Sequence, residues 1–405
     1  MSLSEFVKRH SRESGNLCLY AVQNWIPACA RMTLVLLLVV EPGLFAVRCV
    51  FADEVSPNAS AAETSIFDIS PLLPLTGKSA PILPEEGWIR DQQPSQNYFK
   101  DKVGILLTFE CSDFHFVRML PYLKDWQEKY HDDGFGIIGI HGADYAVDAD
   151  TENVKQALEH WHIDWPMAMT TEAWMVTPSL SLTGPRSLII GSDGSVLFEH
   201  AGEGEYRSME TIIAQALGQL RPDFKAKPLS PFRRDEDQPG IIGYPVTPLL
   251  RLGYASGKLP SPIIFENNKT VNYNYRFAPI NDHRIYVSGH WRSDAQALNF
   301  QGDHFHVDDH IQLAYRAAEV YVMASGVTDH DARVYLEMDG KALDKRVAGA
   351  DVIYDRDEHS FILVNRPRVY QIINEKAVTS RRLFLHPSEK NICFYYFGFG
   401  SRRVK

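Results

Sequence analysis

The sequence predicts two domains, an α/β domain followed by an all-β sandwich. At 405 residues the chain is longer than one ordinary domain. Apolar runs typical of buried strands alternate with helical segments up to about residue 220. Beyond residue 243, short alternating runs are separated by turn residues. Hydrophobic residues make up 45% of the chain and charged residues 23%, which is typical of packed globular proteins.

The amino-terminal segment predicts export. Residues 32–52 are typical of a secretory signal, because an apolar run from Leu34 to Val40 precedes a small residue, Ala52. The run falls short of the roughly 20 apolar residues of a membrane span, so a signal anchor is the alternative. Residues 1–31 resemble the translated form of an interspersed bacterial repeat, which makes Met32 the expected start. We therefore expect a periplasmic or other extracytoplasmic protein.

A flexible leader, residues 53–75, should precede the α/β domain of residues 76–220. Apolar spacing and turn residues predict the elements of that domain. They are a strand at 103–109, a helix at 114–130 with a kink at Pro121, a strand at 136–141, a helix at 151–158, a hairpin at 185–198 and a helix at 208–220.

Residues 221–243 are rich in proline and charge and predict a linker. The second domain, residues 244–405, then follows. Its predicted strands are 284–289, 310–315, 319–323, 333–337, 359–364 and 392–397.

Charge and cysteine content exclude several classes of protein. The net charge is −10 and the isoelectric point near 5.8, whereas nucleic-acid binding needs a basic face, so we expect no nucleic-acid partner. Removal of the signal would leave Cys111 and Cys393. Two cysteines in different domains do not form a disulfide framework.

Several motifs resemble the extracytoplasmic region of the DipZ family. In the first domain they are Leu120–Trp126, Gly139–His141, Asn153–Val154, Gly184–Arg186 and Gly202–Tyr206; in the second they are Leu252–Tyr254, Ser288–Trp291, Met338–Gly340 and Phe397–Gly400. The resemblance covers about residues 76–405. It implies a thioredoxin-like fold followed by a jelly-roll domain similar to carbohydrate-binding modules. The membrane domain of that family has no counterpart in this sequence.

The sequence departs from this family at the redox motif. The resemblance places the two cysteines of the Cys-x-x-Cys motif at Asp113 and Phe116, and a dithiol cycle needs both sulfurs. Pro185, preceded by Gly184, matches the family's cis-proline, which flanks the site and contacts extended peptide. The resemblance therefore implies a peptide groove without dithiol chemistry.

Cys111 leaves a redox alternative open. Thr108 and Cys111 fit the Thr-x-x-Cys pattern of peroxiredoxins, and Arg186 or Arg118 would supply the positive charge that a reactive thiol needs. Glu110 would act in the opposite direction by raising the thiol pKa. An inert, half-buried cysteine is the other interpretation. Asp113 likewise fits either acid–base chemistry or a helix N-cap.

Two further clusters of side chains contain residue types that bind ligands. His304 and His306 would share one face of a strand, but no second cluster at ligand spacing accompanies them, so we expect no metal and no cofactor. Tyr286 and Trp291, with neighbouring tyrosines, would form a sugar-stacking platform or else part of the sandwich core.

The sequence thus favours an exported, non-redox binding or scaffold protein rather than an enzyme. Its expected partners are an extended peptide or protein, a glycan-like ligand and a separate membrane redox protein. The alternative is a single-cysteine thiol oxidoreductase or peroxidase that uses Cys111.

Overall fold

The computed structural model describes residues 34–41, 44–51, 75–91, 93–169, 184–275, 283–326 and 330–402, the first two ranges as backbone alone. The chain divides into two compact units, residues 1–70 and 71–405. In the first unit, β1 (Leu34–Glu41) pairs antiparallel with β2 (Leu44–Phe51). This hairpin falls on the expected signal segment, which stays a prediction. Among the described helices, none is long and apolar enough to cross a membrane.

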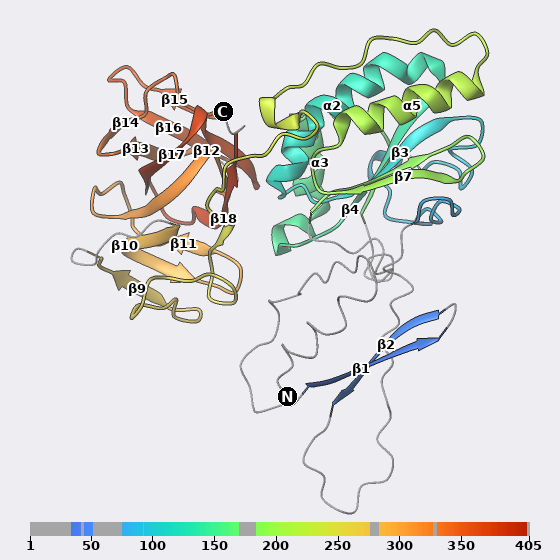
Figure 1. Ribbon diagram of the computed structural model, residues 1–405. Coiled ribbons are helices and arrows are strands. Elements are labelled where there is room, and N and C mark those ends of the chain that lie inside the picture. Colours follow the sequence, from blue (N-terminus) through green and yellow to red (C-terminus); the bar gives the residue numbers. More distant parts are fainter. Residues whose placement is uncertain are drawn as a thin grey trace, which may run out of the picture. The chain divides into compact units, whose positions relative to one another are not determined.

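The second unit begins with a five-stranded mixed sheet in the order β5-β4-β3-β6-β7 (Figure 1). Strands β3, β4 and β5 run parallel, and β6 and β7 are antiparallel to their neighbours. Their bounds are β3 Val103–Phe109, β4 Phe135–His141, β5 Met167–Met169, β6 Arg186–Ile190 and β7 Val196–Ala201. The expected turn at residues 192–194 closes the β6–β7 hairpin, and Gly194 has the positive φ of +80° that favours glycine there.

The described part of this module contains the helices α2 (Phe114–Tyr130), α3 (Thr151–His160) and α5 (Tyr206–Leu220). The bounds predicted for the first are confirmed, and the helix is continuous through Pro121. The others begin or end within two residues of the prediction. Short 3-10 turns complete the module and the segment after it: η2 Ile89–Asp91, η3 His131–Asp133, η4 Ala146–Asp148 and η5 Asp235–Asp237.

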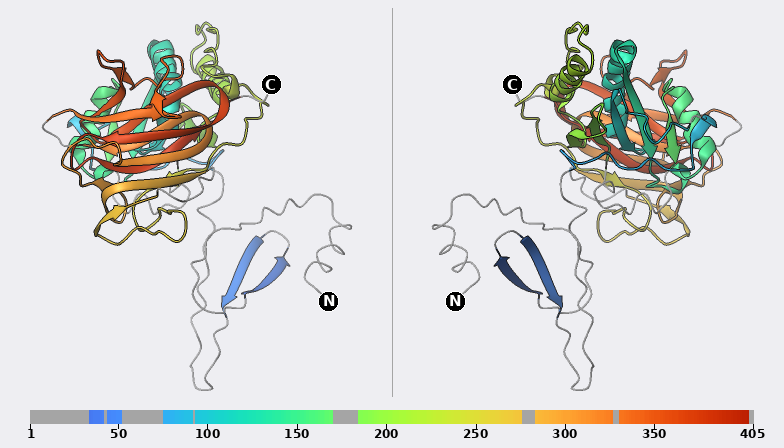
Figure 2. Two further views of the ribbon diagram at one scale, coloured as in Figure 1. Left: turned by 90° about the vertical axis from the view of Figure 1, so that its left-hand side faces the viewer. Right: turned by 90° about the vertical axis from the view of Figure 1, so that its right-hand side faces the viewer.

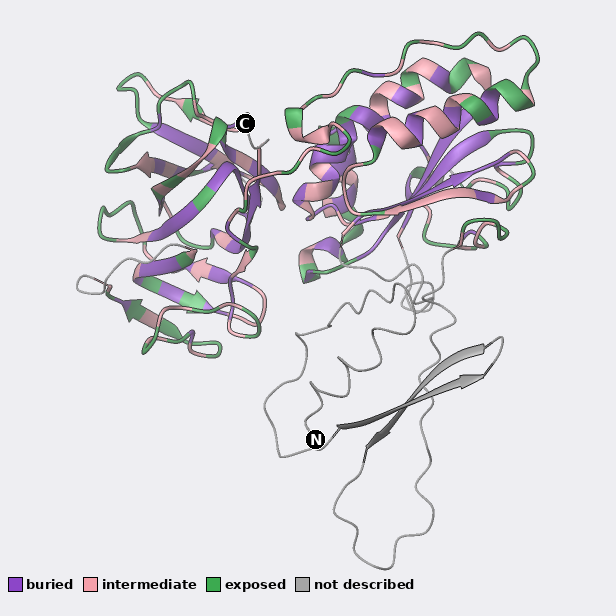
Figure 3. Cartoon of the chain, in the orientation of Figure 1, coloured by how far each residue is buried: buried purple, intermediate pink, exposed green. Residues whose placement is uncertain are grey.

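The sheet is buried on both faces, as its uninterrupted apolar strands predict (Figure 3). Along β3, Ile105 and Leu107 pack with side chains of the three helices. The intervening Leu106 packs on the opposite face with Leu83 and Phe99 of the preceding segment. The fold of this module is therefore α/β and thioredoxin-like, with helix α2 following the central strand directly.

The rest of the unit is an antiparallel all-β module of eleven strands (Figures 1 and 2). The strands are β8 Leu250–Arg251, β9 Thr270–Tyr273, β10 Arg284–Ser293, β11 Leu298–Phe300, β12 His310–Ser325, β13 Ala332–Met338, β14 Lys341–Ala342, β15 Ile353–Tyr354, β16 Ser360–Val364, β17 Arg368–Pro387 and β18 Cys393–Gly400. The all-β class is confirmed; the jelly-roll topology stays a prediction.

Two long strands organise this module. Strand β12 pairs with β17 along almost its whole length, and on its other side with β10 and then β18. The two segments predicted at 310–315 and 319–323 are thus one strand. Strand β18 brings the carboxyl-terminal residues against helix α2, and this contact positions the site.

Candidate functional site: a pocket at the amino end of helix α2

The turn between β3 and α2 is built from the two positions where the DipZ-like motif would carry cysteines. Asp113 is the N-cap of α2, and its Oδ1 accepts a hydrogen bond of 2.9 Å from the amide of His115. Phe116 is fully buried, with its ring 4.0 Å from that of Phe109. The predicted N-cap is confirmed. One position caps the helix and the other fills the core.

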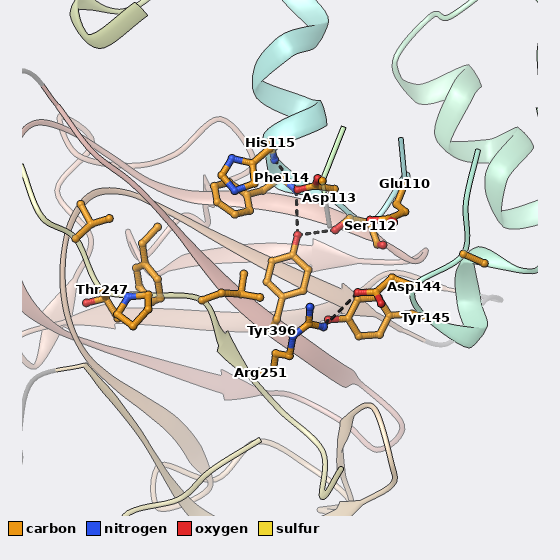
Figure 4. Close-up of a pocket in the computed structure, with 16 residues that line it drawn as sticks. Glu110, Ser112, Asp113, Phe114, His115, Asp144, Tyr145, Thr247, Arg251 and Tyr396 are labelled. Carbon is orange, nitrogen blue, oxygen red and sulfur yellow. Dashed lines mark hydrogen bonds and ion pairs between the residues drawn. The ribbon is translucent and has the colours of Figure 1, made fainter. Parts of the chain in front are cut away.

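A cavity of about 660 Å³ opens beside this turn (Figure 4). Both modules contribute to it. From the first module it is lined by Glu110, Ser112, Asp113, Phe114, His115, Ala143, Asp144, Tyr145 and Gly184, and from the second by Val246, Thr247, Pro248, Leu249, Arg251, Tyr396 and Phe399. A concave site with polar groups on an apolar background is the usual form of a ligand pocket.

Tyr396 of β18 anchors the all-β module to the turn (Figure 4). Its hydroxyl donates to the carbonyl oxygen of Ser112 over 2.5 Å and accepts from the amide of Phe114 over 3.1 Å. The second bond satisfies one of the free amides at the start of a helix. The backbone groups at the amino end of α2 are therefore partly occupied by the protein's own second module.

The glycines of the Phe397–Gly400 motif allow this approach. A Cβ on Gly398 would lie 2.5 Å from the ring of Phe114, and one on Gly400 would lie 2.5 Å from Nη1 of Arg118. Arg118 is buried and pairs with Glu319 of β12, as well as with the acidic groups Glu203 (2.7 Å) and Glu236 (3.3 Å). The positive charge of Arg118 is therefore used in ion pairs that join the two modules.

Burial raises the pKa values of the carboxyl groups around the turn. For Glu110, burial and then the charges of Asp113, Asp144 and Asp148 raise the pKa to about 8, against the opposing effect of Arg251. The pKa of Asp148 rises to about 6, mainly through burial. Burial also raises the pKa of Asp113. The Glu110 carboxyl therefore carries a proton at neutral pH.

Cys111 does not line this pocket, and only 6% of its surface is exposed. Burial and then the charges of Asp148 and Glu110 raise its thiol pKa well above the ordinary value. Its amide donates to Nε2 of His141 over 3.1 Å, and burial lowers the pKa of that histidine to about 3, so the ring is neutral. A nucleophilic thiol needs the opposite electrostatic setting.

The other predicted redox residues have partners other than the thiol. Arg186 is buried and pairs with Glu199 of the neighbouring strand, and it is not among the groups that shift the Cys111 pKa. Pro185 is buried too, and its carbonyl accepts from the amide of Gly202 (2.7 Å). Among the described residues the cis peptide bond is Ser261–Pro262, so the expected cis bond before Pro185 is wrong. Gly184 turns the chain there with φ +101°.

Gly184 does line the pocket, as the groove interpretation requires. A Cβ on it would lie 3.6 Å from Oδ2 of Asp113. Gly184 and the turn before α2 therefore form adjacent parts of the pocket wall.

The sugar-stacking platform is a prediction that the structure corrects. Trp291 has no exposed surface and Tyr286 is 2% exposed. The Trp291 ring packs in the core against Phe300 (5.0 Å between centroids) and Phe394 (6.0 Å). Tyr286 lies on the other face of β10, because strand side chains alternate, and its ring packs against that of Tyr275 (5.2 Å between centroids). Both rings are therefore buried by the protein itself.

His304 and His306 line a second, polar cavity of about 550 Å³ in the all-β module. The ligand atoms of these histidines do not converge with other metal-binding groups. Among the described residues, the group that does converge is Asp355, Asp357 and His359, which lies mostly exposed at the surface.

Sequence reasoning missed Arg251, Tyr145 and Tyr396 as pocket residues. Arg251 and Tyr396 lie more than a hundred positions after the turn. Arg251 is also 106 positions from Tyr145, to whose hydroxyl it donates a hydrogen bond of 2.7 Å. The glycine pair at 398 and 400 was the available signal, because small residues mark close approach of another element.

Comparison with known proteins agrees with this architecture. Residues 248–400 match the family model described as "Thioredoxin like C-terminal domain". Over 314 residues the chain is 23% identical to protein DipZ of Mycobacterium tuberculosis, covering 74% of this chain and 39% of DipZ. It is 26% identical over 217 residues to human NHL repeat-containing protein 2, covering 52% of this chain and 27% of that protein. The chain thus spans about two-fifths of DipZ.

Solved structures similar to the first module include two thiol-disulfide proteins. One is the thioredoxin domain of a thiol-disulfide oxidoreductase from Bacteroides vulgatus (21% identity, 34% of this chain, 97% of that chain, TM-score 0.29). The other is a thiol-disulfide isomerase from Corynebacterium glutamicum (16% identity, 35% and 96%, TM-score 0.30). The chain thus carries a match to the thioredoxin-like C-terminal domain model at residues 248–400, and it is distantly similar to DipZ.

Proposed function

We propose that this protein acts outside the cytoplasm as a non-redox binding protein that holds an extended peptide or protein segment in the pocket at the amino end of α2. The observation that carries the proposal is an open pocket beside a buried thiol whose surroundings are acidic. Thiolate chemistry needs a stabilised anion, and Asp148 and Glu110 destabilise one at Cys111. Binding a peptide needs no sulfur.

The pocket has the composition that peptide binding requires. Its apolar wall includes Leu249, which is 41% exposed, and Phe399. The opposite wall offers carboxyl groups and the Gly184 loop. Extended segments are held by alternating apolar and polar contacts of this kind. A glycan-like ligand of the second module and a separate membrane redox protein remain predicted partners.

The test measures binding of fluorescein-labelled octapeptides from a positional-scanning library to the full chain, by fluorescence anisotropy. We expect Leu249→Asp to weaken the best peptide at least tenfold, because it places a charge on the apolar wall. Ile264→Asp is the matched control, since Ile264 is 67% exposed and does not line the pocket. Equal binding by wild type and Leu249→Asp contradicts the proposal.

Cys111→Ser separates the redox alternative from this proposal. We expect unchanged peptide binding in this variant, and slow, peroxide-insensitive thiol labelling of the wild-type protein at pH 7. Peroxide consumption by the wild type that disappears in Cys111→Ser would show a thiol enzyme.

A further inference from the structure

One wall of the pocket carries carboxyl oxygens without a protein partner. Within the described residues, no hydrogen bond or ion pair reaches the Glu110 carboxyl. Asp113 uses only Oδ1, for the amide of His115; its Oδ2 is shielded from solvent and has no hydrogen-bond partner among the described groups. Glu110 is partly buried, whereas the shielded Oδ2 of Asp113 is a buried oxygen that is costly unless something binds it.

The basic groups of the pocket are already engaged elsewhere. The guanidinium of Arg251 donates to the Tyr145 hydroxyl (2.7 Å) and to Asp144 (3.2 Å). Nδ1 of His115 lies 3.0 Å from Glu203. The charges of Arg251 and His115 act on Glu110 and Asp113 respectively. Among the described residues, however, neither basic group makes a hydrogen bond or ion pair with the Glu110 carboxyl or with Oδ2 of Asp113.

The shape of the cavity favours an organic cation over a metal ion. At about 660 Å³ the cavity is far larger than an ion needs. Its carboxylates also do not belong to the described group whose ligand atoms lie within 4.8 Å of one another, which is Asp355, Asp357 and His359. The facing wall, with Val246, Pro248 and Leu249, is suited to apolar side chains next to the charge.

Resting on the function proposed above, we infer that the pocket selects a peptide carrying a lysine or arginine side chain, whose cationic group binds between Glu110 and Asp113 while the flanking residues lie on the apolar wall. A charge-assisted hydrogen bond in a shielded site is worth more than a neutral one. Basic peptides should therefore bind more tightly than isosteric neutral ones.

Proton exchange should accompany this binding. The Glu110 pKa is about 8, raised by burial and by Asp113, Asp144 and Asp148 and lowered by Arg251. A bound cation requires the ionised carboxylate, so a proton must leave Glu110. Affinity for a lysine peptide should rise from pH 6 to pH 9, whereas lysine itself stays charged over that range, with its pKa about 10.4.

The experiment compares the best octapeptide with either lysine or norleucine at one position, bound to the full chain at pH 8.5. We expect a preference for lysine of at least tenfold. Glu110→Gln should reduce that preference to about threefold or less. Asp113→Asn should act in the same direction and keep the helix cap, because asparagine is also a good N-cap. Asp357→Asn, an exposed carboxylate outside the pocket, is the control.

The outcomes distinguish the two proposals. Equal binding of lysine and norleucine peptides, sensitive to Leu249→Asp, overturns the cation inference and leaves the peptide-binding function intact. Failure of every peptide to bind the wild-type chain removes both. Displacement of the lysine peptide by millimolar CaCl₂ but not by KCl of equal ionic strength would assign the carboxylates to a divalent cation and also overturn the inference.

Discussion

Removal of the Tyr396 hydroxyl should destabilise the protein more than removal of an equally buried tyrosine hydroxyl elsewhere. In Tyr396→Phe, the Ser112 carbonyl and the Phe114 amide both lose a partner in a site shielded from water. A buried polar group left without its partner costs about 1–3 kcal/mol. We therefore expect the free energy of unfolding to fall by about 2–4 kcal/mol, as two such groups are affected.

Tyr370→Phe is the matched control. Tyr370 has no exposed surface, and its hydroxyl donates a hydrogen bond to the carbonyl oxygen of Arg366 over 2.9 Å. Loss of one such bond costs about 1 kcal/mol. Urea unfolding followed by tryptophan fluorescence measures both variants, and hydrogen exchange at the Phe114 amide reports the junction itself. That amide should exchange faster in Tyr396→Phe and unchanged in Tyr370→Phe.

Equal stability losses in the two variants, with unchanged protection of the Phe114 amide, would refute this reasoning. Such a result would mean that β18 does not bond the turn before α2 in solution. Tyr396 would then not form part of the pocket lining in solution.

Three further predictions concern stability, each measured by urea unfolding. Because the Glu110 pKa is raised from 4.5 to about 8, folding takes up protons between these pH values, so the free energy of unfolding should fall as pH rises from 4.5 to 8. Glu110→Gln should reduce this fall, to which Asp148 also contributes, and should gain about 1–3 kcal/mol at pH 8.5. An unchanged pH profile would contradict this prediction. Gly398→Ala should lower the free energy of unfolding by about 1–3 kcal/mol, because the added Cβ would overlap the Phe114 ring. Gly218→Ala in helix α5 should be neutral or stabilising, since its Cβ would lie 3.6 Å from Phe224, and equal effects of the two changes would refute the close approach at Gly398. Trp291→Ala should cost about 3–5 kcal/mol because the ring is in the core, and an unchanged stability would restore the surface platform.

Local periodicity was sufficient for the first module. The helix at Phe114–Tyr130 and the strand at Val103–Phe109 have the predicted bounds, because each carries an apolar pattern that only its own element type can bury. In the second module, β17 (Arg368–Pro387) escaped prediction. Its middle contains a charged and polar stretch around Glu375 and Arg381 that breaks the alternation, and its pairing with β12 determines it as a strand.

The features of the candidate site also fall into those that the sequence predicted and those that needed the structure. The sequence by itself determined the α/β and all-β modules and made Asp113 a candidate N-cap, since these depend on residue type and short spacing. Only the tertiary structure decided that Cys111 is buried, that Trp291 is core, and that Tyr396 meets a turn 284 positions away. The raised pKa of Glu110 belongs to this second group, because it depends on burial and on carboxylates that other segments bring near.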